Sequence, residues 1–108
     1  MKLIIGIINN DDSGTVSNAL NKGGFFVTKL STTGGFLKKG NTTLLIGTAD
    51  EKVNEAIEII KKYAKKRVTK EPAVPSAEMG EFFTPVMIDV LVGGATIFVL
   101  PIEQFEKI

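Results

Sequence analysis

The chain has 108 residues, 44% of them hydrophobic, which is enough for one small domain with a core. Its formal net charge of +1 argues against a protein that binds nucleic acid polymers through a broad basic surface. The sequence contains neither Cys nor His. Disulfides, zinc–thiolate sites and Ser–His–Asp or Cys–His catalysis are therefore excluded.

The first predicted element is a strand over residues 3–8, a continuous apolar run that is typical of a strand covered on both faces. Polar residues 9–12 end this run, which makes it too short for a secretory signal or a membrane span. We therefore expect a cytoplasmic protein with no membrane contact. Residues 11–13 offer N-cap oxygens for a short helix, and Gly23 and Gly24 predict its end.

Two further strands are predicted on either side of a glycine-rich loop. Residues 25–32 are rich in β-branched and aromatic side chains, and residues 41–48 have an apolar centre. The segment between them, 33–40, has three glycines in eight positions, which predicts irregular structure.

The second helix is predicted by apolar residues that step by three and four from Val53 to Ala64. We expect Thr48 or Asp50 to cap it. The basic residues that crowd positions 61–70 suit the negative end of this helix, or alternatively face a phosphate.

The last third of the sequence predicts a long loop and two strands. Residues 71–83 contain prolines and a glycine, and a loop of this length is usually functional or disordered. Residues 86–92 and 95–100 are predicted strands, and the intervening Gly93 and Gly94 predict a hairpin turn.

This order predicts a single α+β domain, residues 1–108, with a ferredoxin-like βαββαβ arrangement and an added C-terminal strand. Such a fold places two helices on one face of an antiparallel sheet. The other face has no layer from the same chain to cover it. We therefore expect a closed homo-oligomer.

The strongest candidate for a binding site is the segment 28–43. Its glycines allow close approach of backbone N–H groups to a ligand, and its hydroxyls add donors. Phe36 has no obvious core to join, so it either stacks on a base or packs against an apolar surface of its own or a neighbouring subunit. Asn41 offers the donor and acceptor pair that matches an adenine edge.

A second candidate is the segment 92–96, which is either a simple turn or a backbone that contacts a ligand. The carboxylates show no paired or metal-binding arrangement. We therefore predict no catalytic residue, no metal site and no enzymatic activity.

The segments 28–43 and 92–101 resemble the cyclic di-AMP receptor family of PII-like proteins, and the resemblance extends over residues 1–105. It implies a PII-like fold and a homotrimer that binds one cyclic di-AMP in each cleft between neighbouring subunits, with no cofactor. Phe26 is a departure, because some relatives carry an arginine at this position near the phosphates or a base.

The resemblance also implies roles for individual residues. Thr28 and the backbone around Phe36 would hold one nucleotide half, Asn41 would bind a base edge, and the two glycines after residue 92 would approach from the adjacent subunit. The complete set of implied ligand-binding residues is Thr28, Gly35, Phe36, Leu37, Asn41, Gly47, Gly93, Gly94 and Phe98.

The function that these features predict is a signal transduction protein that binds cyclic di-AMP and reorders the segments 33–40 and 71–83 to signal to an unknown downstream protein. One alternative is a PII-like trimer that binds ATP or AMP. A ferredoxin-like RNA-binding module is less compatible with such aliphatic strands. A small nucleotide hydrolase would lack His and paired carboxylates in its glycine loop.

Overall fold

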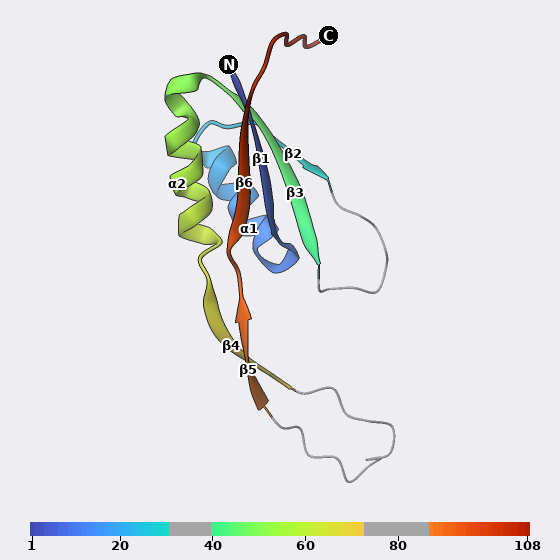
Figure 1. Ribbon diagram of the computed structural model, residues 1–108, viewed down its shortest axis with the longest axis vertical. Helices are drawn as coiled ribbons and strands as arrows, with labels where there is room; N and C mark the ends of the chain where they lie inside the picture. The colour runs from blue at the N-terminus through green and yellow to red at the C-terminus, as the bar shows by residue number, and fades with distance from the viewer. Residues whose placement is uncertain (31–39, 73–86) are drawn as a thin grey trace.

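The computed structural model describes residues 1–30, 40–72 and 87–108 (Figure 1). The predicted combination of two helices with β-sheet is confirmed. In chain order the elements are β1 (Lys2–Asn9), α1 (Asn10–Lys22), β2 (Val27–Leu30), β3 (Asn41–Thr48), a 3₁₀ turn (Asp50–Lys52), α2 (Val53–Tyr63), β4 (Arg67–Pro72), β5 (Met87–Val92) and β6 (Ala95–Pro101).

The main sheet has four strands in the order β2-β3-β1-β6, and each neighbouring pair is antiparallel. A separate two-stranded sheet contains β4 and β5, and it extends away from the main sheet (Figure 1). The apolar run at the start of the chain becomes β1, an inner strand as predicted. However, only one face of β1 is fully buried, because Ile4 and Ile8 lie in the core while Ile5 and Ile7 stay half-exposed.

The predicted hairpin through Gly93 and Gly94 is wrong. β5 pairs with β4, whereas β6 pairs with β1 at the edge of the main sheet. The two glycines have φ of +87° and +85°, and the N–H of Gly94 donates to the carbonyl of Ala64, so the pair carries the chain from one sheet to the other. The additional strands therefore lie between α2 and β6, and no strand is added at the C-terminus.

β4 was not expected from the sequence, which indicated a basic helix end and the start of a long loop over these residues. Helix α2 ends at Tyr63, and residues 67–72 form a strand instead. Val68 and Thr69 are β-branched, and they pair with Leu91 and Val90 of β5. Arg67 and Lys70 thus belong to a strand rather than to an extended helix.

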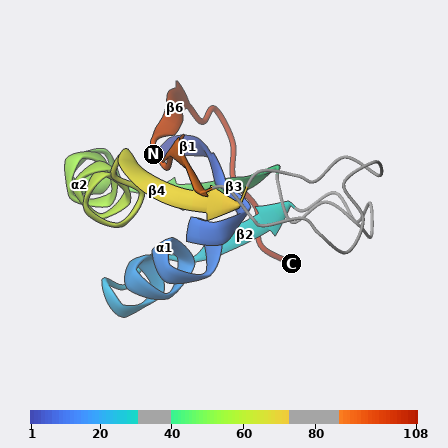
Figure 2. The same cartoon turned by 90° about the horizontal axis from the view of Figure 1, so that it is seen from below.

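Both helices pack on the same face of the main sheet (Figure 2). The predicted periodicity of α2 is confirmed at its buried positions, while Tyr63 stays 38% exposed. The core consists of aliphatic side chains from β1, β3 and the two helices with their ends, together with one aromatic ring: Ile4, Ile8, Val16, Leu20, Phe25, Leu44, Ile46, Ala56, Ile60 and Ala64.

The helix starts differ from the predictions. Helix α1 is capped by Asn9, whose side chain accepts a hydrogen bond of 3.0 Å from the Asp11 N–H, so residues 11–13 lie inside the first turn. Neither Thr48 nor Asp50 caps α2, since Thr48 is buried in the sheet and Asp50 begins the 3₁₀ turn that leads into the helix. The end of α1 at Gly23 is confirmed.

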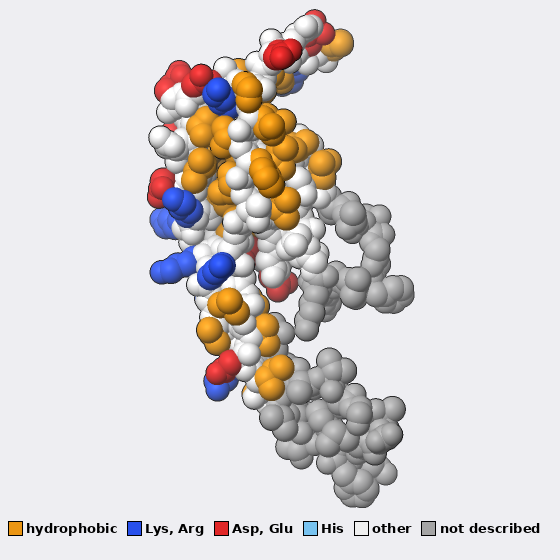
Figure 3. All heavy atoms as spheres, in the orientation of Figure 1, with side chains coloured by type: hydrophobic (Ala, Val, Ile, Leu, Met, Phe, Trp, Pro, Cys, Tyr) orange, Lys and Arg blue, Asp and Glu red, His pale blue; other side chains and the backbone are white. Residues whose placement is uncertain are grey.

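The face of the main sheet opposite the helices is apolar, and no helix or strand of the described residues covers it; we call it the open face. Because side chains alternate between the two faces of a strand, paired residues place one row of side chains across this face. The row consists of Phe98 on β6, Ile5 on β1, Leu45 on β3 and Thr28 on β2. Phe98 is 51% exposed. Figure 3 shows apolar side chains gathered over these strands. In the described part of the chain, no helix is both long and apolar enough to cross a membrane.

Candidate ligand-binding site

Four of the predicted ligand-binding residues share the open face. In β3, Asn41 and Gly47 stand on the same side as Leu45, and Leu45 is opposite Thr28 of β2. Phe98 lies on the same face at the other edge of the sheet. The predicted residues Gly35, Phe36 and Leu37 lie outside the described residues.

Thr28 and Gly47 line one end of this face, at a cavity of about 680 Å³. That volume is within the usual range for small-molecule sites. Its other walls include Phe26 and Phe105, and the Lys107 ammonium lies 5.3 Å from the centre of the Phe26 ring. The cavity therefore combines a hydroxyl and a bare backbone with aromatic surfaces.

Asn41, Gly93 and Gly94 meet at the other end of the sheet, where they line a groove of about 270 Å³ together with Asn9 and Lys66. We call this hollow the Lys66 groove. The family resemblance implies that both glycines approach the ligand from a neighbouring subunit, and this stays a prediction.

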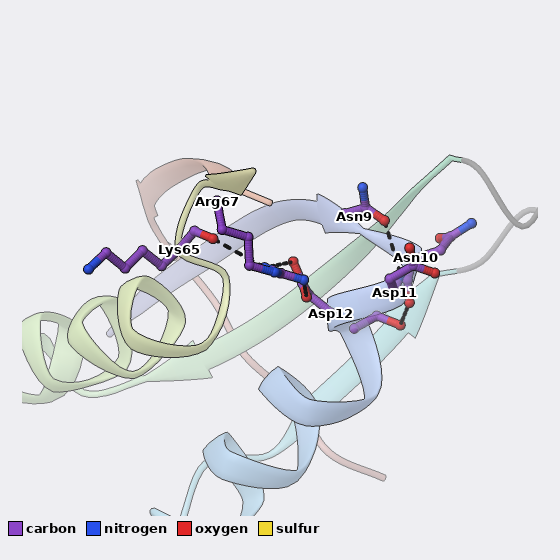
Figure 4. Close-up of polar contacts among 7 residues, drawn as sticks. Asn9, Asn10, Asp11, Asp12, Lys65 and Arg67 are labelled. Atoms are coloured by element: carbon purple, nitrogen blue, oxygen red, sulfur yellow. Dashed lines mark hydrogen bonds and ion pairs between the residues drawn. The ribbon is translucent and has the colours of Figure 1, made fainter. Parts of the chain in front are cut away.

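Asn9 and the first turn of α1 support one side of the Lys66 groove, and Figure 4 shows the side chains of this turn. The backbone N–H of Asn10 donates to the Gly40 carbonyl at 2.9 Å, and the Thr42 hydroxyl donates to the Asn10 side-chain oxygen. These contacts hold the residues on both sides of Asn41. The start of β3 is consequently tied to the helix rather than only to its neighbouring strand.

The same turn holds the other side of the groove through Asp12. Its carboxylate is only 5% exposed and accepts two hydrogen bonds from Arg67, of 2.6 and 3.2 Å. Arg67 also donates to the Lys65 carbonyl at 3.1 Å (Figure 4). Hydrogen bonding to Asp12 raises the pKa of Arg67 above its ordinary value. Because a raised pKa favours the charged form, the Arg67 guanidinium stays charged at neutral pH and loses its proton only in strong alkali.

Replacing Asp12 with Ala is expected to lower the free energy of unfolding by about 2 kcal/mol, since it removes two charge-assisted hydrogen bonds at a buried position. Urea unfolding followed by circular dichroism measures this change. The matched control is Asp11→Ala, because Asp11 is an exposed acid in the same helical turn. Asp11→Ala should lower the free energy of unfolding by no more than about 1 kcal/mol, because it removes only a favourable interaction with the helix dipole. Equal losses would show that the Arg67 contact does not stabilise the fold.

Sequence reasoning identified the residues along the open face but missed those that support them. Asp12 appeared as a helix cap, and nothing in a single sequence pairs it with an arginine 55 positions later. Lys66 was one of several lysines in a basic run. Phe26 was noticed only as a departure from relatives, although alternation with Thr28 already places it toward the open face.

Comparison with known proteins agrees with this description. The sequence matches a family model described as "Cyclic-di-AMP receptor" over residues 1–108. The crystal structure of a functionally unknown protein from Pediococcus pentosaceus ATCC 25745 is similar, with 43% sequence identity and a TM-score of 0.72; the match covers 99% of this chain and 96% of that chain. The family resemblance seen in the glycine-rich segments is thus confirmed. The chain belongs to the cyclic di-AMP receptor family.

Proposed function

We propose that this protein is a cytoplasmic signal transduction protein that binds cyclic di-AMP between the subunits of a PII-like homotrimer. The observation that carries the proposal is the family match over residues 1–108, because that family is a receptor family and not an enzyme family. The geometry supports it, since the implied ligand-binding residues in the described chain line the open face or its two hollows.

A trimer would cover the open face. Large apolar side chains on this face, such as Leu30 and Phe98, are each 51% exposed in the single chain. Contiguous exposed apolar surface of this kind marks an interaction site, and closed rings are the usual form of soluble homo-oligomers. The strand order β2-β3-β1-β6, with both helices on the other face, leaves this surface free to meet copies of itself. We therefore propose that a ferredoxin-like core assembles through its open face.

The ligand would be recognised by short polar groups beside apolar walls. Thr28 supplies a hydroxyl and Asn41 supplies an amide, which can pair with an adenine edge. Phe36 would stack on a purine, as the family resemblance implies. The hydroxyl and the amide are separated along the sheet, because Thr28 stands opposite Leu45 and residues 41 and 45 of an extended strand are roughly 13 Å apart. A ligand with two bases could contact both.

Calorimetric titration tests this function. The wild-type protein should bind cyclic di-AMP in preference to cyclic di-GMP and ATP. Phe36→Ala should weaken binding by about 1–3 kcal/mol through lost stacking, and Asn41→Ala should weaken it through a lost base contact. Asn54→Ala is the matched control, because Asn54 is an exposed asparagine on α2. Failure of all three ligands to bind would exclude the sensing role, and tighter binding of ATP would favour a PII-like ATP receptor.

A signal reaches a downstream protein only if ligand binding changes the surface that this protein recognises. We propose that cyclic di-AMP reorders the segments 33–40 and 71–83 and thereby changes this surface. Hydrogen exchange on the titrated samples provides the readout. Slower exchange in both segments with ligand supports this step, and unchanged exchange contradicts it.

A further inference from the structure

The ligand-binding residues that the family resemblance implies offer hydroxyl, amide, aromatic and backbone groups, but none of them is charged. Cyclic di-AMP carries two phosphodiester groups, each with a negative charge at neutral pH. Moving such groups out of water is costly unless a positive charge or hydrogen-bond donors replace the lost solvation. A cation beside the site would therefore strengthen the binding of this ligand.

Lys66 is the single charged residue among the described residues that line the Lys66 groove. The groove also holds Asn41, which offers an amide, and Thr96, which offers a hydroxyl. A lysine ammonium next to these neutral donors makes a suitable environment for one phosphodiester oxygen.

The Lys66 side chain lies against Gly94. A Cβ atom at position 94 would lie 3.1 Å from both Cγ and Cε of Lys66, so the absence of a side chain at Gly94 leaves room for the lysine stem. The stem thus runs along the backbone that begins β6. This contact restricts the lysine side chain, so its ammonium lies along one wall of the groove.

The backbone that carries Lys66 is held on both sides. The Ala64 carbonyl accepts from the Gly94 N–H, and the Lys65 carbonyl accepts from Arg67, which is itself held by the buried Asp12. The residues before and after Lys66 therefore have fixed partners. Fixed backbone lowers the entropy that the lysine loses when it binds an anion.

A neighbouring hollow is less suitable for a phosphate. This hollow of about 310 Å³ shares Asn9 and Asn41 with the Lys66 groove, but its charged residue is Asp11. A carboxylate repels a phosphodiester. The two hollows thus place opposite charges on either side of Asn41, and an anion is favoured on the Lys66 side.

We propose that Lys66 binds a phosphodiester group of the ligand, with Gly94 as the surface on which its stem rests. This assignment rests on the proposed function, since it names the cation of the same site. It applies to a cyclic dinucleotide or another phosphodiester ligand that reaches Asn41. The basic run around residue 66 thus contains one lysine with a binding role among others that face solvent.

The test is calorimetric titration of the full-length protein with cyclic di-AMP at low and moderate salt. Lys66→Gln should weaken binding about tenfold at low salt and reduce the salt dependence of the affinity. Lys66→Arg, which keeps the charge, should restore most of the affinity. The matched control is Lys65→Gln, an exposed neighbour that removes the same charge but does not line the groove. It should bind like the wild type.

Each outcome decides between the two proposals. If the wild type binds and Lys66→Gln binds equally well, or if Lys65→Gln is weakened to the same extent, the Lys66 assignment is wrong while the sensing function stands. If the wild type binds no cyclic di-AMP, the proposed function fails and this assignment fails with it. Thermal unfolding of each variant verifies that it is folded.

Discussion

Replacing Gly93 with Ala is expected to remove measurable cyclic di-AMP binding and to lower the free energy of unfolding by about 3 kcal/mol. Gly93 has a φ of +87°, which L side chains rarely adopt. A Cβ atom there would also overlap the Lys65 carbonyl oxygen and lie 2.9 Å from Nη1 of Arg67. The backbone must then move, and the Lys66 groove changes shape with it. Urea unfolding and calorimetry measure the two effects.

Gly24 supplies the control for the backbone conformation. Its φ of +89° is nearly the same as that of Gly93, but a Cβ atom there would meet nothing within 4 Å. Gly24→Ala should therefore lower the free energy of unfolding only by the penalty for a positive φ, about 1 kcal/mol. It should leave ligand binding unchanged. The difference between the two variants isolates the contact with Lys65 and Arg67. Equal destabilisation by both would show that this contact imposes no constraint.

Replacing Ile5 with Glu is expected to convert the proposed trimer to a monomer. Ile5 lies on the inner strand β1 of the open face, between Phe98 and Leu45. A carboxylate buried there between subunits would lose its hydration without gaining a partner, which costs several kcal/mol per subunit. In the single chain the position is only half-buried, so the monomer can still fold. Sedimentation equilibrium measures the molar mass.

Tyr63→Glu is the control for this change, because Tyr63 is exposed on α2, on the covered side of the sheet. This variant should keep the oligomeric state of the wild type and its affinity for cyclic di-AMP. The Ile5→Glu monomer should bind the ligand much more weakly, because the proposed cleft lies between subunits. A monomeric wild type, or an unchanged assembly in Ile5→Glu, would contradict the proposed role of the open face.

The elements that sequence alone predicted well are those whose signal is local. Helix α2 follows from a strong 3.6-residue periodicity, and β1 and β3 follow from apolar runs bounded by polar residues. The glycine-rich segments also stood out locally, and they carried the family resemblance that the comparison confirmed. Short-range pattern was therefore enough to find these elements and the family.

The pairing of the last strands was mispredicted because it depends on distant partners. Two strands separated by Gly93 and Gly94 favour a hairpin. In the structure, however, β6 pairs with β1 in the main sheet, and β5 pairs with β4. Likewise, the bond between Asp12 and Arg67 joins residues that only the fold brings together. Long-range contacts of this kind leave no pattern in a single sequence.

The hydrogen bond between Ala64 and Gly94 has a consequence for how this architecture can vary. This bond joins residue 64, just before β4, to residue 94, just after β5, so the two ends of the segment that contains β4 and β5 lie side by side. An insertion or deletion within this segment would therefore leave the end of α2 and the start of β6 next to each other. We therefore expect the main sheet and its two helices to tolerate changes in the length of the segment between β4 and β5.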